Sequence, residues 1–143
     1  ATAAQFAAQD LSRMEAQGCV AVTYSPTGVA AASVGDGLFF LSANGRVLYR
    51  TTDAAIKAYD GTNTPSHAVT WAANTPVRLA NRWSGTTSTL YDLTAGTSTA
   101  GTYDGTWGFG ATSTIDVGYT ATSATPEGWL YNLQADPNPL RCR

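Results

Sequence analysis

Apolar and polar residues alternate along most of the chain after residue 18. Val20, Val22 and Tyr24 alternate with alanine or small polar residues, which is the period of a half-buried β-strand. Further apolar or alternating runs follow, separated by turn-forming residues roughly every 8–15 positions. The expected strands lie at residues 38–41, 46–50, 55–59, 68–71, 77–85, 89–93, 115–119 and 129–133. This pattern predicts an all-β antiparallel sandwich or barrel, without a second domain.

Three local patterns add detail to that prediction. Asn44-Gly45 between two apolar runs predicts a hairpin, and a two-residue turn there sets Leu41 opposite Leu48. In residues 77–85, the apolar positions share one face and the two arginines share the other. In the last strand, Trp129, Tyr131 and Leu133 are expected to point the same way.

Residues 3–17 differ, because Ala, Gln, Met and Glu favour a helix and Gly18 would end it. Phe6, Leu11 and Met14 would form a thin apolar stripe on this helix. The segment is either a short helical turn packed on the sandwich edge or an arm that docks on a partner. We therefore divide the chain into a helical segment or arm, 1–17, and a sandwich, 18–143.

Composition narrows the classes of function. The chain has 143 residues and a net charge of -2, and 13% of its residues are charged, about half the usual share. This balance argues against nucleic-acid binding, which needs clustered Lys and Arg. No apolar run is long enough to predict a membrane span. Gln5, Gln9 and Asp10 stand where a signal peptide would be apolar, so we expect a product made without one.

The two cysteines, Cys19 and Cys142, lie near opposite ends of the sequence and cannot form a C-x-x-C metal site. They are either two separate buried thiols or a disulfide that ties the last residues to an early strand.

The segment "TWAANTPVRLANRWSGTTSTLYDLTAGTSTAGTYDG" resembles the central strands of laminin-G-like, concanavalin-like jelly rolls. "STIDVGY" is similar to the following strand of that family, and "EGWLYNLQ" is similar to its last strand. The resemblance implies that residues 120–126 form a surface loop and that Gly128 lets the backbone enter the final strand. Asp92-Leu93 departs from the family's Asp-Gly, which blurs the match around residues 90–100.

Within that family, the strand "VRLANRWSG" and the lead-in segment resemble domains of tailed-phage virion proteins. The resemblance implies a non-enzymatic capsid decoration or fibre-type protein on an extracellular particle. Its partners would be other virion proteins and host-surface glycans, and it would form a homo-oligomer in the assembly. It also implies that the first and last strands pair, which would bring Cys19 and Cys142 together. The alternatives are a stand-alone lectin-like module and a glycoside hydrolase of the same fold.

Few residues of the sequence are candidates for catalysis or metal binding. A glycosidase needs two carboxylates about 5–10 Å apart, yet no expected strand carries acids two residues apart. His67, the only histidine, has no nucleophile motif near it and is expected at the surface. We expect no cofactor; calcium is the one metal with candidate ligands, which are Asp36, Asp60, Asn63 and Asp104.

The remaining candidates are aromatic. Most Trp and Tyr residues are expected in the core. Trp107 stands apart, because glycines flank it in a predicted loop, where an exposed ring could stack on a sugar or a partner. The expected contact set is Tyr103, Asp104, Trp107 and Phe109.

Overall fold

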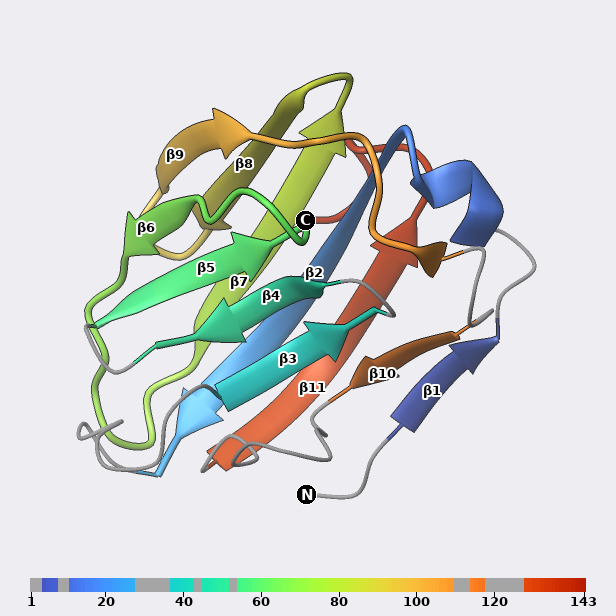
Figure 1. The fold of residues 1–143 in the computed structure, drawn as a ribbon. Helices are drawn as coiled ribbons and strands as arrows, with labels where there is room; N and C mark the ends of the chain where they lie inside the picture. The colour runs from blue at the N-terminus through green and yellow to red at the C-terminus, as the bar shows by residue number, and fades with distance from the viewer. Residues whose placement is uncertain are drawn as a thin grey trace.

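The protein is an antiparallel β-sandwich of two sheets packed face to face (Figure 1), seen in a computed structural model. The structure describes residues 4–7, 11–27, 37–42, 45–51, 54–109, 114–117 and 128–143. The six-stranded sheet has the order β1 (Ala4–Ala7), β10 (Thr114–Val117), β3 (Gly37–Leu41), β4 (Arg46–Arg50), β5 (Ala55–Tyr59) and β6 (Ser66–Ala68). The five-stranded sheet has the order β11 (Gly128–Asp136), β2 (Gln17–Pro26), β7 (Val77–Ser84), β8 (Thr87–Asp92) and β9 (Thr97–Thr102). The predicted all-β, two-sheet sandwich is confirmed.

The core follows from the alternation in β2 and β7. Val22 lies opposite Leu79 and Tyr24 opposite Val77, and all four side chains are buried between the sheets. Arg78 and Arg82 lie on the other face of β7, as the sequence predicted. Residues two apart in a strand share a face, so a single register fixes both the core and the outer surface.

The β3–β4 hairpin exists, but its predicted register is wrong. Ser42 donates its backbone N–H to the carbonyl of Gly45 at 2.9 Å, and Phe40 rather than Leu41 lies opposite Leu48. The register shifts at two places in β3, on either side of Phe40. These irregularities place the consecutive side chains of Phe39 and Phe40 both in the core, which strict alternation would forbid.

The predicted helix over residues 3–17 is wrong. Residues Ala4–Ala7 form β1 and pair with β10, with Phe6 opposite Ile115. Helical structure in the described part of this segment is one short 3-10 turn, Leu11–Met14. The free edge of β10 offers backbone hydrogen bonds that outweigh the helix preference of Ala and Gln.

The described parts of the N-terminal segment contact the sandwich, whereas docking of this segment on a partner stays a prediction. Met14 is 2% exposed and belongs to the main core cluster, and its carbonyl accepts a hydrogen bond of 2.6 Å from the indole N–H of Trp83. The side chains of Phe6 and Leu11, the other two members of the predicted stripe, lie outside the described atoms.

One side of the sandwich is closed by β6 and β9. The strand expected at residues 68–71 is misplaced, because β6 covers Ser66–Ala68 and shares only Ala68 with it. Strand β9 forms where a Gly/Thr/Ser-rich connection was expected. His67 of β6 is buried rather than at the surface, because Nδ1 contacts Oγ1 of Thr99 at 2.9 Å and Nε2 contacts Oγ1 of Thr97 at 3.0 Å. These contacts cross from one sheet to the other, so the histidine has a structural role.

Candidate functional site

The expected contact set of Tyr103, Asp104, Trp107 and Phe109 is not an aromatic surface patch. Tyr103, Trp107 and Phe109 are each 1% exposed and pack around Trp83 in the core. The ring centroids of Trp83 and Trp107 are 5.4 Å apart, and those of Tyr103 and Trp107 are 4.9 Å apart. Only Asp104 of the four is exposed. The prediction that Trp107 contacts a glycan or partner from an exposed loop is therefore wrong.

Glu15 explains why this loop turns inward. Its carboxylate accepts the backbone N–H of Trp107 at 2.7 Å and the backbone N–H of Phe109 at 2.5 Å. The Tyr103 hydroxyl also donates to the Glu15 carbonyl oxygen. Burial, followed by the nearby negative charges of Glu15, Asp104 and Asp60, raises the pKa of Tyr103 far above its ordinary value, so the phenol stays a donor.

Three of the four candidate calcium ligands meet in a single loop cluster. The Asp60 carboxylate accepts N–H bonds of 2.8, 2.6 and 3.0 Å from Thr62 and Asn63, and one of 2.8 Å from the backbone of Asp104. Burial alone would raise the pKa of Asp60, but these hydrogen bonds, led by those from Asn63, outweigh it and lower the pKa. The carboxylate thus joins two loops through N–H donors.

Calcium binding stays a prediction from the sequence, and Asp36 lies outside the described residues. Within the described ranges, no group of three or more His, Cys, Asp or Glu side chains is placed to hold a metal ion.

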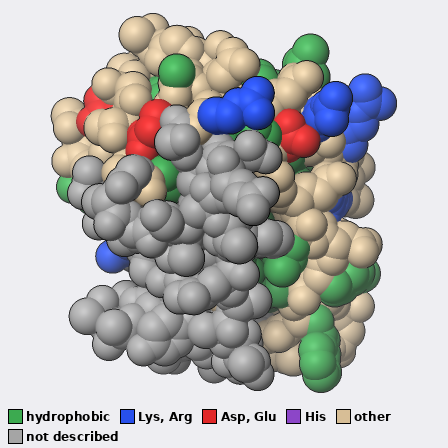
Figure 2. All heavy atoms as spheres, turned by 90° about the vertical axis from the view of Figure 1, so that its right-hand side faces the viewer, with side chains coloured by type: hydrophobic (Ala, Val, Ile, Leu, Met, Phe, Trp, Pro, Cys, Tyr) green, Lys and Arg blue, Asp and Glu red, His purple; other side chains and the backbone are tan. Residues whose placement is uncertain are grey.

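The two most exposed aromatic side chains among the described residues lie on β11, and a third, Tyr59 at the end of β5, is 38% exposed. Trp129 is 72% exposed and Tyr131 is 40% exposed, and both sit on the outer face of the five-stranded sheet, opposite Ser25 and Thr23 of β2. Figure 2 shows hydrophobic side chains at the molecular surface at the lower right, on the side of β11. We call Trp129 and Tyr131 the β11 aromatic pair.

A β-bulge determines which side chains of β11 lie on this outer face. The pairing of β11 with β2 shifts between Tyr131 and Gln134, and Asn132 adopts a left-handed φ of 52° there. The extra residue reverses the alternation, so Leu133 packs against the core although Tyr131 points outward. The expectation that Trp129, Tyr131 and Leu133 point the same way is therefore wrong at Leu133.

A polar groove of about 500 Å³ lies beside the β11 aromatic pair, and Arg78 and Asn132, which follows Tyr131, are among its lining residues. Tyr131 pairs with Thr23, which pairs with Arg78, so the three residues form one row across β11, β2 and β7. The Arg78 guanidinium donates to the Asn132 carbonyl at 2.5 Å and to Oε1 of Gln134 at 2.7 Å. Burial lowers the pKa of Arg78, because desolvation disfavours the charged guanidinium.

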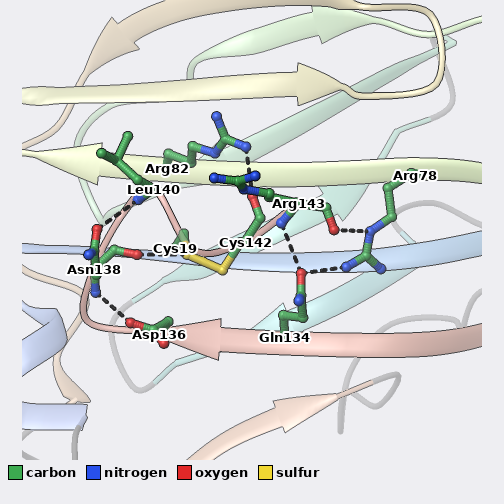
Figure 3. The surroundings of a disulfide bond; sticks show 9 residues. All are labelled: Cys19, Arg78, Arg82, Gln134, Asp136, Asn138, Leu140, Cys142 and Arg143. Carbon is green, nitrogen blue, oxygen red and sulfur yellow. Dashed lines mark hydrogen bonds between the residues drawn. A yellow bond between two sulfur atoms is a disulfide. The ribbon is translucent and has the colours of Figure 1, made fainter.

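The C-terminal segment completes the groove (Figure 3). Cys142 forms a disulfide with Cys19 of β2, with their Cα atoms 5.9 Å apart, so the two cysteines meet as the resemblance implied. The backbone carbonyl of Cys142 accepts from Arg82 at 2.6 Å, and that of Arg143 accepts from Nε of Arg78 at 2.9 Å. Both cysteines are buried, so the bond fixes residues 137–143 against the outer face of the sheet.

Comparison with known proteins shows the fold alone. No protein-family model matches the chain, and no curated protein sequence matches it. The CBM40 module of the Ruminococcus gnavus IT-sialidase, solved bound to α2,3-sialyllactose, superposes with a TM-score of 0.63 at 13% identity, over 90% of this chain and 80% of that one. A Trypanosoma rangeli sialidase mutant gives a TM-score of 0.61 at 12% identity, over 90% of this chain. The chain spans only 22% of that sialidase.

A third neighbour is a heptameric SAP-like pentraxin from Limulus polyphemus, with a TM-score of 0.54, 14% identity and coverage of 87% of this chain and 65% of that one. These neighbours support the jelly-roll, concanavalin-like sandwich. None of the three is a phage virion protein. In the described part of the chain, no helix has the length and apolar character needed to cross a membrane.

Sequence reasoning therefore missed Trp129, Tyr131 and Arg78 as a surface. The sequence did contain a signal, because Leu130 is also apolar and lies on the opposite face of β11 from Trp129. Two apolar faces on one strand indicate that one of them is exposed or covered by a partner.

Proposed function

We propose that the protein is a non-enzymatic carbohydrate-binding module whose site is the β11 aromatic pair with the Arg78 groove. The observation that carries the proposal is the exposure of two aromatic side chains, two residues apart, on the outer face of the five-stranded sheet. Trp129 and Tyr131 have exposed fractions of 72% and 40%, whereas Trp71, Trp83 and Trp107 are at most 6% exposed. A sandwich that buries its other tryptophans has no packing reason to expose this one.

The surface matches the two kinds of contact that a sugar ring offers. The C–H faces of a pyranose are apolar and can stack on the flat rings of Trp129 and Tyr131, which lie about 7 Å apart along the strand. The hydroxyl groups at the rim of the sugar need donors and acceptors. The groove supplies them from Thr23, Asn132 and Gln134, close to Tyr131.

Acidic sugars are the first ligands to examine. The Arg78 guanidinium lines the groove, where it donates to oxygens of Thr23, Asn132, Gln134 and Arg143. We infer that the positive charge of this side chain favours an anionic ligand over a neutral one. The Ruminococcus module was solved with α2,3-sialyllactose, which carries one carboxylate, and this makes that trisaccharide a suitable probe.

The carboxylates support a binding role over a hydrolytic one. Every acidic side chain that the structure describes accepts at least one backbone N–H bond in a turn or loop. They are Glu15, Asp60, Asp92, Asp104 and Asp136. A glycoside hydrolase needs two carboxyl groups that face one ligand across roughly 5–10 Å. Backbone N–H groups already hold each of these described carboxylates, which favours a structural role for them over a hydrolytic one.

The phage-virion role stays a prediction from the sequence resemblance, as does the particle location. The disulfide supports an extracellular or otherwise oxidising environment, because such bonds persist there.

A glycan array with matched variants tests the proposal. We expect the wild-type protein to bind a restricted set of glycans and Trp129→Ala to lose that binding. Leu140→Ala is the control, since Leu140 is 69% exposed and lies beyond the far end of β11. Binding that survives Trp129→Ala with Tyr131→Ala, or that falls equally with Leu140→Ala, would contradict the proposed site. The absence of binding to any glycan would contradict the function.

A further inference from the structure

Strand β9 forms an open edge of the five-stranded sheet, at the opposite end of the sheet from β11. Its residues Thr97–Thr102 pair with β8 on one side, and no described strand pairs with the other side. All six residues are exposed or half-buried at their side chains. In Figure 1, β9 is the outermost strand at the upper left.

This edge lacks the features that keep sheet edges apart. Natural edge strands carry charged residues, proline or bulges that prevent pairing with another chain. The sequence of β9, TSTAGT, contains no charged residue and no proline, and its six pairs with β8 run without a register shift. The other end of the same sheet differs, because β11 has the bulge at Asn132.

The inner side of β9 is already occupied. Thr97 and Thr99 contact His67, and Pro65 packs on Gly101, where a Cβ would meet the proline Cβ at 2.5 Å. These contacts hold β9 against β6 on one face of the strand and do not use the backbone groups of its free edge.

The direction of the free backbone groups follows from the β8–β9 ladder. Tyr103, next after β9, donates its N–H to the carbonyl of Thr86 at 2.8 Å. Because antiparallel residues alternate between bonded and non-bonded pairs, the N–H and C=O groups of Ser98, Ala100 and Thr102 point away from β8.

We propose that β9 pairs antiparallel with β9 of a second copy of this chain, with Ala100 of each copy opposite the other. This arrangement is symmetric, as a two-fold dimer requires, and places Ser98 opposite Thr102 of the second copy. It forms about six backbone hydrogen bonds between the copies. The side chains that meet are small and uncharged, so a second copy of the same edge meets neither steric nor like-charge repulsion.

The pairing joins the two five-stranded sheets into one continuous sheet and leaves both β11 aromatic pairs at its far ends. One pair of six-residue strands buries less than the roughly 1,200 Å² typical of stable interfaces. The dimer is therefore weak and depends on protein concentration. It requires nothing of the glycan site, so the two proposals fail independently.

Sedimentation of the wild-type chain over a range of concentrations, up to about 1 mM, tests the pairing. We expect a reversible monomer–dimer equilibrium. Ala100→Pro removes an outward N–H that β8 does not use and should weaken the dimer at least about tenfold. Ala100→Ser keeps that N–H and should leave the equilibrium unchanged. A wild-type chain that is monomeric throughout, or a dimer unaffected by Ala100→Pro, would overturn the proposal.

A charge exchange provides a test that keeps every backbone N–H. Ala100→Lys places two lysines opposite each other across the two-fold axis, and Ala100→Glu places two glutamates there. Each variant alone should be monomeric, and an equal mixture of the two should dimerise. A mixture that stays monomeric, with both variants folded by circular dichroism, would overturn the pairing centred on Ala100.

Discussion

Removing the Cys19–Cys142 bond should destabilise the protein strongly without changing its fold. The bond joins residues that are 123 positions apart, so it restricts nearly the whole unfolded chain. In the chain-entropy model, closing a loop of this length lowers the free energy of folding by about 5 kcal/mol. A small domain has a total stability of roughly 5–15 kcal/mol, so the bond accounts for a large part of it.

Urea unfolding of the wild type and of Cys19→Ala with Cys142→Ala measures this loss. We expect the free energy of unfolding to fall by about 3–5 kcal/mol and the m-value to rise, because the unlinked unfolded chain exposes more surface. A reducing agent reaches the buried disulfide when the wild type unfolds, so it should lower the urea midpoint of the wild type. The midpoint of the double variant should stay the same. A loss below about 1 kcal/mol, at an unchanged m-value, would refute the reasoning.

Three further predictions concern the loops and the core. Glu15→Gln should cost about 2–3 kcal/mol in the free energy of unfolding, because one of two loop N–H groups loses its charged acceptor; an unchanged urea midpoint would contradict this. The folded-state pKa of Asp60 lies below its unfolded value, so Asp60 stabilises the protein above about pH 4 and this contribution is lost as the pH falls through the folded pKa. Asp60→Asn should therefore lower stability at pH 7 more than at pH 2, and equal losses at both would count against it. Trp107→Ala should cost about 3–5 kcal/mol whereas Trp129→Ala costs about 0.5 kcal/mol or less, and thermal unfolding compares them.

The fold class could be predicted from the sequence because alternation fixes it locally. In β7, Val77 and Leu79 face the core while Arg78 faces outward, as the pattern required. The N-terminal strand could not be predicted in this way. Residues Ala4–Ala7 favour a helix by composition, and they form β1 because a distant strand, β10, offers its edge.

The sequence prediction placed Trp107 at the surface and the other tryptophans in the core, whereas the structure buries Trp107 and exposes Trp129. The reason is related. Glycines beside Trp107 suggested an exposed loop, but Glu15, far away in the sequence, binds the loop and draws its rings into the core. Trp129 lies in an alternating strand, where either face could have been the buried one. The bulge at Asn132 settles which face is buried, and no local pattern announces it. Both errors concern contacts between distant segments, which local periodicity does not encode.

Tryptophan fluorescence tests the central claim most directly. Trp129 is 72% exposed and the other three tryptophans are at most 6% exposed, so acrylamide should quench mainly Trp129. A saturating glycan that binds the wild type, with α2,3-sialyllactose as the first candidate, should shield this residue and reduce the quenching. Trp129→Phe should lack the quenchable component, and Trp129→Ala should weaken glycan binding by about tenfold to thirtyfold. A glycan that binds with full affinity while Trp129 stays equally quenchable would show that the site lies elsewhere.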